Sequence, residues 1–109
     1  MELMTKKQEE QLVKNHKASQ ANPDKDLKHK AVIKLFNPSG IGTWYFSEYD
    51  PETRIGFGVA DLGFPEMGYT AVHQLEDLKL PFGNKIERDL SFKENKYSLK
   101  ECLELCKNG

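Results

Sequence analysis

The stretch from Thr43 to Tyr69 is the feature that most constrains how this chain folds. It contains the single tryptophan, three of the four tyrosines and three of the six phenylalanines. Short runs of β-branched and aromatic residues alternate in it with turn signals rich in Gly, Pro and Asp, which is typical of adjacent antiparallel strands. The stretch therefore predicts a β-meander in the middle of a small sheet, closed over by the remaining strands and helices.

The length of 109 residues predicts one folded unit, because chains divide into separate cores only at larger sizes. The first thirty residues are much more polar than the rest. We expect residues 1–30 to form a Lys-rich helix and linker, and residues 31–109 to form a single α+β domain. No apolar run approaches the roughly 20 residues that span a bilayer, and no signal peptide is recognised, so we expect a cytoplasmic protein without a membrane partner.

Hydrophobic periodicity and turn signals define the expected elements. The expected strands are 31–36, 43–49, 55–61, 67–70 and 86–92, and the expected helices are 5–15, 71–78 and 99–107. Thr5 with Gln8, and Ser98 with Glu101, have the spacing of a capping box, and Thr70 is expected to cap the middle helix. The predicted fold class is α+β, a mostly antiparallel sheet of about five strands with two or three short helices packed on one side.

Two glycines within the third predicted strand require an explanation. Gly56 and Gly58 point to the face opposite Phe57, and glycine weakens a strand unless something approaches its backbone closely. Either a helix or the ring of Trp44 or Tyr45 lies over this face, or a ligand or a partner's backbone does.

Charge is divided unevenly along the chain. Residues 1–34 contain eight lysines and five acids, whereas residues 44–78 contain seven acids and one arginine. Nucleic-acid binding needs a basic footprint, so the sheet region is unsuited to it and only the N-terminal segment offers a route. The lysines of that route are Lys6, Lys7, Lys14, Lys17, Lys25, Lys28 and Lys30.

Metal and cofactor signatures are weak in this sequence. Cys102 and Cys106 are neighbours on a predicted helix, but the second ligand pair of a structural zinc site is missing, and apolar docking explains them better. His16, His29 and His73 are scattered. No phosphate-cradling or nucleotide-binding motif is present, so we expect no metal, no cofactor and no identifiable catalytic residue.

The aromatic residues have two competing interpretations. Seven rings occur within the 26 residues from Trp44 to Tyr69, interspersed with acids. Exposed aromatic residues of this kind form protein–protein hot spots, whereas buried ones would form the core of the fold. The candidate binding residues are Trp44, Tyr45, Glu48, Tyr49, Asp50, Glu66, Tyr69, Glu87 and Arg88.

Four segments, TWYFSEYDPETR, GFG, EMGY and IERDLSF, occur in this order between about residues 31 and 92. Together they resemble the bacterial family known as domain of unknown function number 2958. The positions that match the pattern are Trp44, Tyr45, Glu48, Tyr49, Asp50, Pro51, Glu66, Gly68, Tyr69, Glu87, Arg88 and Asp89. The N-terminal segment and the last residues lie outside this pattern. The resemblance implies a small protein of plasmids, conjugative elements or phages, and implies no activity.

These observations favour a non-enzymatic accessory protein of a mobile element or phage that binds another protein through an acidic, aromatic-rich face. One alternative is a small enzyme in which Glu48, Asp50 and Glu87 perform carboxylate chemistry and Arg88 orients an anion. That alternative requires these side chains to converge in one pocket. A second alternative is nucleic-acid binding through the N-terminal lysines.

Overall fold

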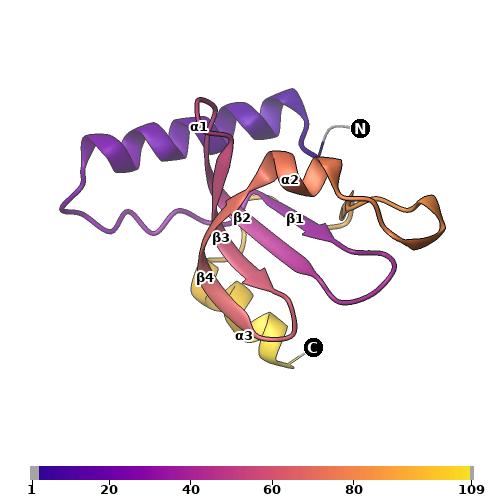
Figure 1. Cartoon of the computed structure of the whole chain (residues 1–109). Helices are drawn as coiled ribbons and strands as arrows, with labels where there is room; N and C mark the ends of the chain where they lie inside the picture. Colours follow the sequence, from indigo (N-terminus) through magenta and orange to yellow (C-terminus); the bar gives the residue numbers. More distant parts are fainter. Residues whose placement is uncertain (1–2, 109) are drawn as a thin grey trace.

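A computed structural model describes residues 3–108 and shows five strands and three α-helices, which confirms the α+β class (Figure 1). The elements are α1 (Lys6–Ala21), β1 (Ile33–Phe36), β2 (Thr43–Asp50), β3 (Ile55–Asp61), β4 (Pro65–Ala71), α2 (Val72–Asp77), the 3-10 helix η1 (Pro81–Gly83), β5 (Glu87–Arg88) and α3 (Leu99–Asn108).

The sheet has the strand order β4-β3-β2-β1-β5, and every neighbouring pair is antiparallel. The strands β1 to β4 follow one another as hairpins, so the predicted meander is confirmed. The chain then returns to the far side of β1, where Arg88 of β5 pairs with Leu35. The strand β2 consequently lies in the centre, with two strands on each side.

Helices cover both faces of this sheet, so the expectation that they pack on one side is wrong (Figure 1). Leu12 of α1 and Val72 of α2 pack with Phe46 against one face. Cys102 of α3 packs with Tyr45 against the opposite face. The physical reason is that β2 carries large apolar side chains on both faces, and each face stabilises the fold only if it is removed from water.

The helix α1 is longer than expected and ends at Ala21 instead of residue 15. The predicted capping box is present, since the Gln8 amide donates to Thr5 Oγ1 at 3.1 Å and the Thr5 amide donates to Gln8 Oε1 at 2.8 Å. Leu12 is fully buried, and Leu3 joins the same hydrophobic cluster. The polar N-terminal helix is therefore anchored to the core of the sheet by a few apolar residues.

The other two helices begin differently from each other. The capping box that was predicted for α3 is confirmed, because the Glu101 amide donates to Ser98 Oγ at 3.1 Å and the Ser98 amide donates to Glu101 Oε1 at 3.0 Å. The expected cap at Thr70 is wrong, because β4 continues through Ala71, which becomes the N-cap of α2 without a side-chain hydrogen bond.

The last strand is much shorter than the expected 86–92, since β5 contains only Glu87–Arg88. Asp89 ends it: its Oδ1 accepts the Ser91 amide at 2.8 Å, forming a local turn that competes with strand pairing. Phe92 then packs against Tyr45, with 5.6 Å between the ring centroids. Local side-chain hydrogen bonding therefore overrides the alternating pattern that predicted a strand.

A β-bulge at Ser47 interrupts the pairing of β2 with β3. Phe46 pairs with Gly58 and Glu48 pairs with Phe57, so Ser47 has no partner across the ladder. An extra residue reverses the alternation of side chains beyond it.

This reversal determines which face of the sheet each side chain of β2 beyond Ser47 occupies. Tyr49 joins Phe46 in the cluster under α1, although a regular strand would place residues three apart on opposite faces. Glu48 instead pairs with Phe57, which packs on the α3 side of the sheet. Without the bulge, a carboxylate would point toward the hydrophobic core and a tyrosine away from it.

The two glycines of β3 are closely approached from within the chain itself. A Cβ atom on Gly56 would lie 2.8 Å from the ring of Phe46, and one on Gly58 would overlap the carbonyl oxygen of Tyr45. The nearest neighbour is the bulged strand β2, through the ring of Phe46 and the backbone of Tyr45, and not a helix or the ring of Trp44 or Tyr45. The glycines therefore accommodate close packing inside the sheet.

Replacing Gly58 with Ala is expected to destabilise the protein by about 3 kcal/mol or more, because the backbone of β2 must move to admit the methyl group. Gly68 is the matched control, since it pairs directly with Gly58 and a Cβ there would meet nothing within 4 Å. Gly68→Ala is expected to change stability by less than about 1 kcal/mol. Urea unfolding of both variants measures the difference, and equal effects would contradict this account of the bulge.

Asn15 connects α1 to the bulge, because its Nδ2 donates to the carbonyl oxygen of the buried Ser47 at 2.9 Å. Asn15→Ala leaves this carbonyl without its partner and is expected to cost about 1–3 kcal/mol of unfolding free energy. Lys14→Ala, at an exposed position of the same helix, is expected to cost less than about 0.5 kcal/mol. A loss of similar size in both variants would mean that helix propensity, and not the hydrogen bond, sets the effect.

Candidate functional site

Three of the candidate aromatic residues belong to the core. Trp44 and Tyr45 each expose 4% of their surface and Tyr49 exposes 9%. Burial raises the pKa of the Tyr45 hydroxyl strongly, and the neighbouring thiols of Cys106 and Cys102 add to this effect. The open question about the aromatic cluster is thus answered for these rings, which cannot contact a partner directly in the folded chain.

Glu66 and Tyr69 lie at the surface, both on β4. Tyr69 exposes 78% of its surface, and its ring packs against Phe57 with 5.0 Å between the centroids. Of the other candidate residues of the sheet, Glu87 on β5 is also exposed.

Glu48 and Asp50 fasten the end of α1 to β2. His16 Nδ1 lies 3.9 Å from Glu48 Oε1, and His16 Nε2 lies 3.7 Å from Asp50 Oδ2. Ser19 Oγ also donates to Glu48 Oε2 at 3.1 Å. The Glu52 amide donates to Asp50 Oδ1 at 2.9 Å, and this hydrogen bond is the main cause of a lowered pKa of the Asp50 carboxyl. These contacts give both carboxylates a structural role.

Glu87 and Arg88 lie elsewhere. Glu87 pairs with Phe36, which in turn pairs with Thr43 at the opposite end of β2. Glu48 is therefore about 15 Å away along the strand direction alone. The structure does not bring Glu87 and Arg88 to Glu48 and Asp50, and the convergence that an acid–base site needs is missing from the described residues.

The thiols and imidazoles are not arranged for metal binding. Cys102 is fully buried on α3, and burial together with the nearby Asp61 carboxylate raises the pKa of the Cys106 thiol. Within residues 3–108, no group of three or more His, Cys, Asp and Glu side chains is placed to hold a metal ion. No helix in the same range is long and apolar enough to cross a membrane.

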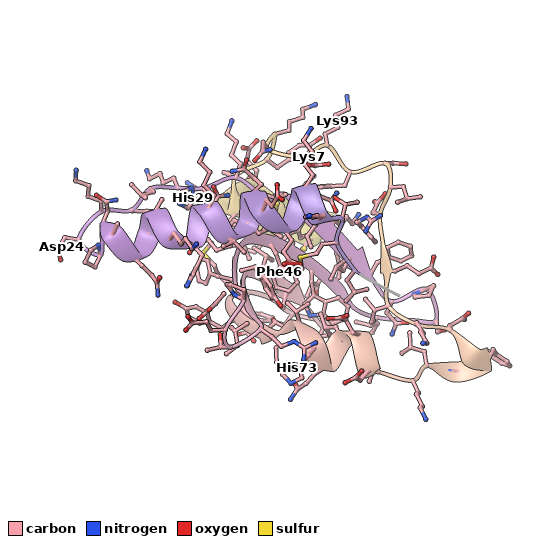
Figure 2. The ribbon with its side chains drawn as sticks, turned by 90° about the horizontal axis from the view of Figure 1, so that it is seen from above. Lys7, Asp24, His29, Phe46, His73 and Lys93 are labelled. Atoms are coloured by element: carbon pink, nitrogen blue, oxygen red, sulfur yellow. The ribbon has the colours of Figure 1, made fainter. Side chains whose placement is uncertain are left out.

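An open cavity of about 650 Å³ lies on the α3 side of the sheet. Four parts of the chain form it: the end of α1, the linker after it, the faces of β2, β3 and β4, and the start of α3. Figure 2 shows the linker running back beside α1 from Asp24 to His29. The lining residues are Ser19, Lys25, Asp26, Leu27, Lys28, His29, Ser47, Glu48, Phe57, Met67, Tyr69, Ser98, Leu99 and Lys100.

Most of these lining residues were not candidates from sequence, because the linker and α3 lie about seventy residues apart and only folding brings them together. The sequence indicates Lys25 and Lys28 only as possible contacts with nucleic acid. The four lysines of α1 are exposed, as that idea requires, but Glu9 and Glu10 are exposed among them. The positive φ of 49° at Lys28 marks an unusual backbone at the cavity rim, and no sequence signal at this lysine indicated it.

The strand β4 forms a free edge beside the cavity, because none of the described strands pairs with its outer side. The Val72 amide donates to the Arg54 carbonyl at 3.0 Å, which continues the β3–β4 ladder. Alternation along the ladder then directs the amide of Gly68 toward β3. The amides of Met67 and Tyr69 point outward, away from the sheet.

A family model described as "Protein of unknown function (DUF2958)" matches residues 3–108. The match extends well beyond residues 31–92 and includes all of α1 and α3, so these helices are part of the family pattern. No curated protein and no solved structure matches the chain.

Burial raises the pKa of the Cys102 thiol from 9.0 to about 12 and also raises that of Cys106. In a Cys106→Ser variant, alkylation of native Cys102 at mildly alkaline pH is expected to be roughly a thousandfold slower than in urea, because only the thiolate reacts. The folded state also disfavours the thiolate, so the stability of this variant should fall as the pH rises above 9.0 toward 12.

Replacing Cys102 with Ala as well is the control, since it should remove this thiol's share of the alkaline loss. Rapid alkylation of the native Cys106→Ser variant would show that Cys102 is accessible and would contradict its assignment to the core.

Proposed function

The chain belongs to the DUF2958 family, whose description assigns no activity, and we propose that it binds another protein by strand addition along β4. The observation that carries this proposal is the free edge itself, seven residues from Pro65 to Ala71. Outward-facing amides and carbonyls on such an edge form main-chain hydrogen bonds with an added strand.

The two edges of the sheet differ in a way that supports this assignment. Proteins shield sheet edges with short strands, charges, proline or covering elements. The β5 edge is only two residues long, whereas β4 is a full strand whose shielding residues are Pro65 at its start and Glu66. A long edge of this kind is suited to pairing.

The side chains near the edge are apolar and accessible. Met67 exposes 45% of its surface, and Phe64, in the turn before β4, exposes 77%. Leu62 in the same turn is exposed as well. Together with Tyr69, these residues provide the aromatic and apolar contacts typical of a binding hot spot. Asp61 and Glu66 flank them, so we expect the bound strand to carry apolar and basic residues.

This proposal keeps the protein-binding role expected from sequence but moves the contact surface from β2 to β4. The candidate residues Glu66 and Tyr69 remain in it, and Phe57 of β3 packs against the ring of Tyr69. A non-enzymatic accessory role in the cytoplasm of a bacterium that carries a plasmid, conjugative element or phage is the setting that we propose, on the resemblance alone.

Met67→Pro tests strand addition, because proline removes an outward amide donor while the inward ladder to β3 keeps its own donors. Met67→Ala is the matched control, since it removes the side chain and keeps the amide. In a pull-down from bacterial lysate, the wild type should retain one specific protein, and Met67→Ala should retain less of it because it lacks the side-chain contact. Folded Met67→Pro should retain at least about tenfold less than Met67→Ala, because it also lacks the outward amide. Circular dichroism verifies that each variant is folded.

Retention of the same partner by Met67→Pro would overturn binding through the edge. Light scattering of the pure protein shows whether β4 binds a second copy of the chain. A wild-type dimer that Met67→Pro converts to a monomer would mean that β4 pairs with a second copy of the chain, and not with a different protein.

A further inference from the structure

We propose that the cavity between the linker and α3 binds a small aromatic anion, a flat apolar ring that carries one carboxylate or phosphate group. This inference is independent of strand addition at β4. The cavity volume of about 650 Å³ falls within the range of small-molecule sites, which combine an apolar surface with a few polar groups that fix orientation.

An aromatic surface is available for the ring of the ligand. Phe57 and Tyr69 lie with their rings tilted by 52° on the sheet, and Tyr69 is largely exposed to the cavity side. Leu99 lines the cavity from α3, and Leu27 lines it from the linker. Aromatic rings prefer offset or tilted contacts with one another, and a bound ring would find such a neighbour in Tyr69.

The charges around the cavity favour an anion. Lys25 and Lys28 of the linker and Lys100 of α3 line it, and none of them forms an ion pair within the described chain. The two carboxylates that also line it are engaged. Glu48 is held by His16 and Ser19, and Asp26 Oδ1 accepts the Lys28 amide at 3.1 Å. The three lysines of the lining therefore outnumber its two carboxylates, and both carboxylates already accept hydrogen bonds from the chain.

His29 adds a polar group that needs a partner. Its ring lines the cavity, and its Nε2 atom is buried without a hydrogen-bond partner among the described residues. Buried polar atoms of proteins are rarely left unpaired, and an imidazole nitrogen can donate to an anionic oxygen. Because this nitrogen is closed to water, the ring of His29 must turn toward the cavity before a carboxylate or phosphate bound there can accept from it.

Amide NMR titration of the full chain tests this proposal with naphthylacetate and naphthyl phosphate, which share a ring and differ in the anionic group. Neutral naphthylacetamide is the charge control, and acetate and inorganic phosphate are the controls without a ring. We expect saturable shifts at residues 25–29, 67–69 and 98–100 with at least one naphthyl anion, and binding of naphthylacetamide at least about tenfold weaker.

Two charge reversals identify the site. Lys100→Glu should weaken binding of the anion by about fivefold or more, and glutamate in the first turn is compatible with helix α3. Lys79→Glu removes the same charge at an exposed position outside the cavity lining and should leave binding unchanged.

The outcomes are decisive in both directions. Binding of only one naphthyl anion identifies the group as a carboxylate or a phosphate, and binding of both shows that any oxyanion suffices. Absence of saturable shifts at millimolar concentration, equal binding of naphthylacetamide, or equal loss in both charge reversals would overturn the proposal. None of these results depends on capture of a protein partner, so failure here leaves strand addition at β4 untouched.

Discussion

The bulge at Ser47 is the constraint on which the rest of the structure depends. It reverses the alternation of β2, so that Tyr49 enters the core beneath α1 while Glu48 faces the cavity side of the sheet. Asn15 binds the carbonyl of Ser47, which links the docking of α1 to this one irregular residue. Gly58 allows the backbone of β2 to come close enough for the bulge to form. The core, the position of α1 and one wall of the cavity therefore share a single local geometry.

Burial of both faces of β2 determines where the protein can interact. With α1 and α2 on one side and α3 on the other, the central aromatic residues become internal support (Figure 1). The surfaces that the three helices leave uncovered include the edge at β4 and the cavity beside it. The contact surface that we propose therefore lies at the margin of the most distinctive stretch of the sequence, because the buried rings of β2 in that stretch stabilise the fold.

The sequence predicted features that depend on neighbours in the chain. The capping boxes at Thr5 and Ser98, the limits of β3 and the burial of Cys102 all follow from local spacing, and they are confirmed. The features that it did not predict depend on residues far apart. The hydrogen bond from Asn15 to Ser47 spans 32 residues, and the cavity joins the linker to α3. The short β5 depends on both kinds of contact. A local turn at Asp89 ends the strand, and its pairing with β1 joins residues far apart in the chain.

The two ends of the linker that lines the cavity differ in their long-range hydrogen bonds. At one end, the Ala31 amide donates to the Tyr97 carbonyl at 2.8 Å, and the Asn95 amide donates to the Ala31 carbonyl at 2.9 Å, so the end of the linker is joined to the segment that leads into α3. Between Lys25 and Lys28, the backbone hydrogen bonds of the described chain are local, as in the contact of the Lys28 amide with Asp26. Segments held by few long-range contacts open at low free-energy cost. An anion bound between Lys28 and Lys100 would supply a connection across the cavity that the chain itself does not make, and its binding would therefore stabilise the linker more than any other part of the fold.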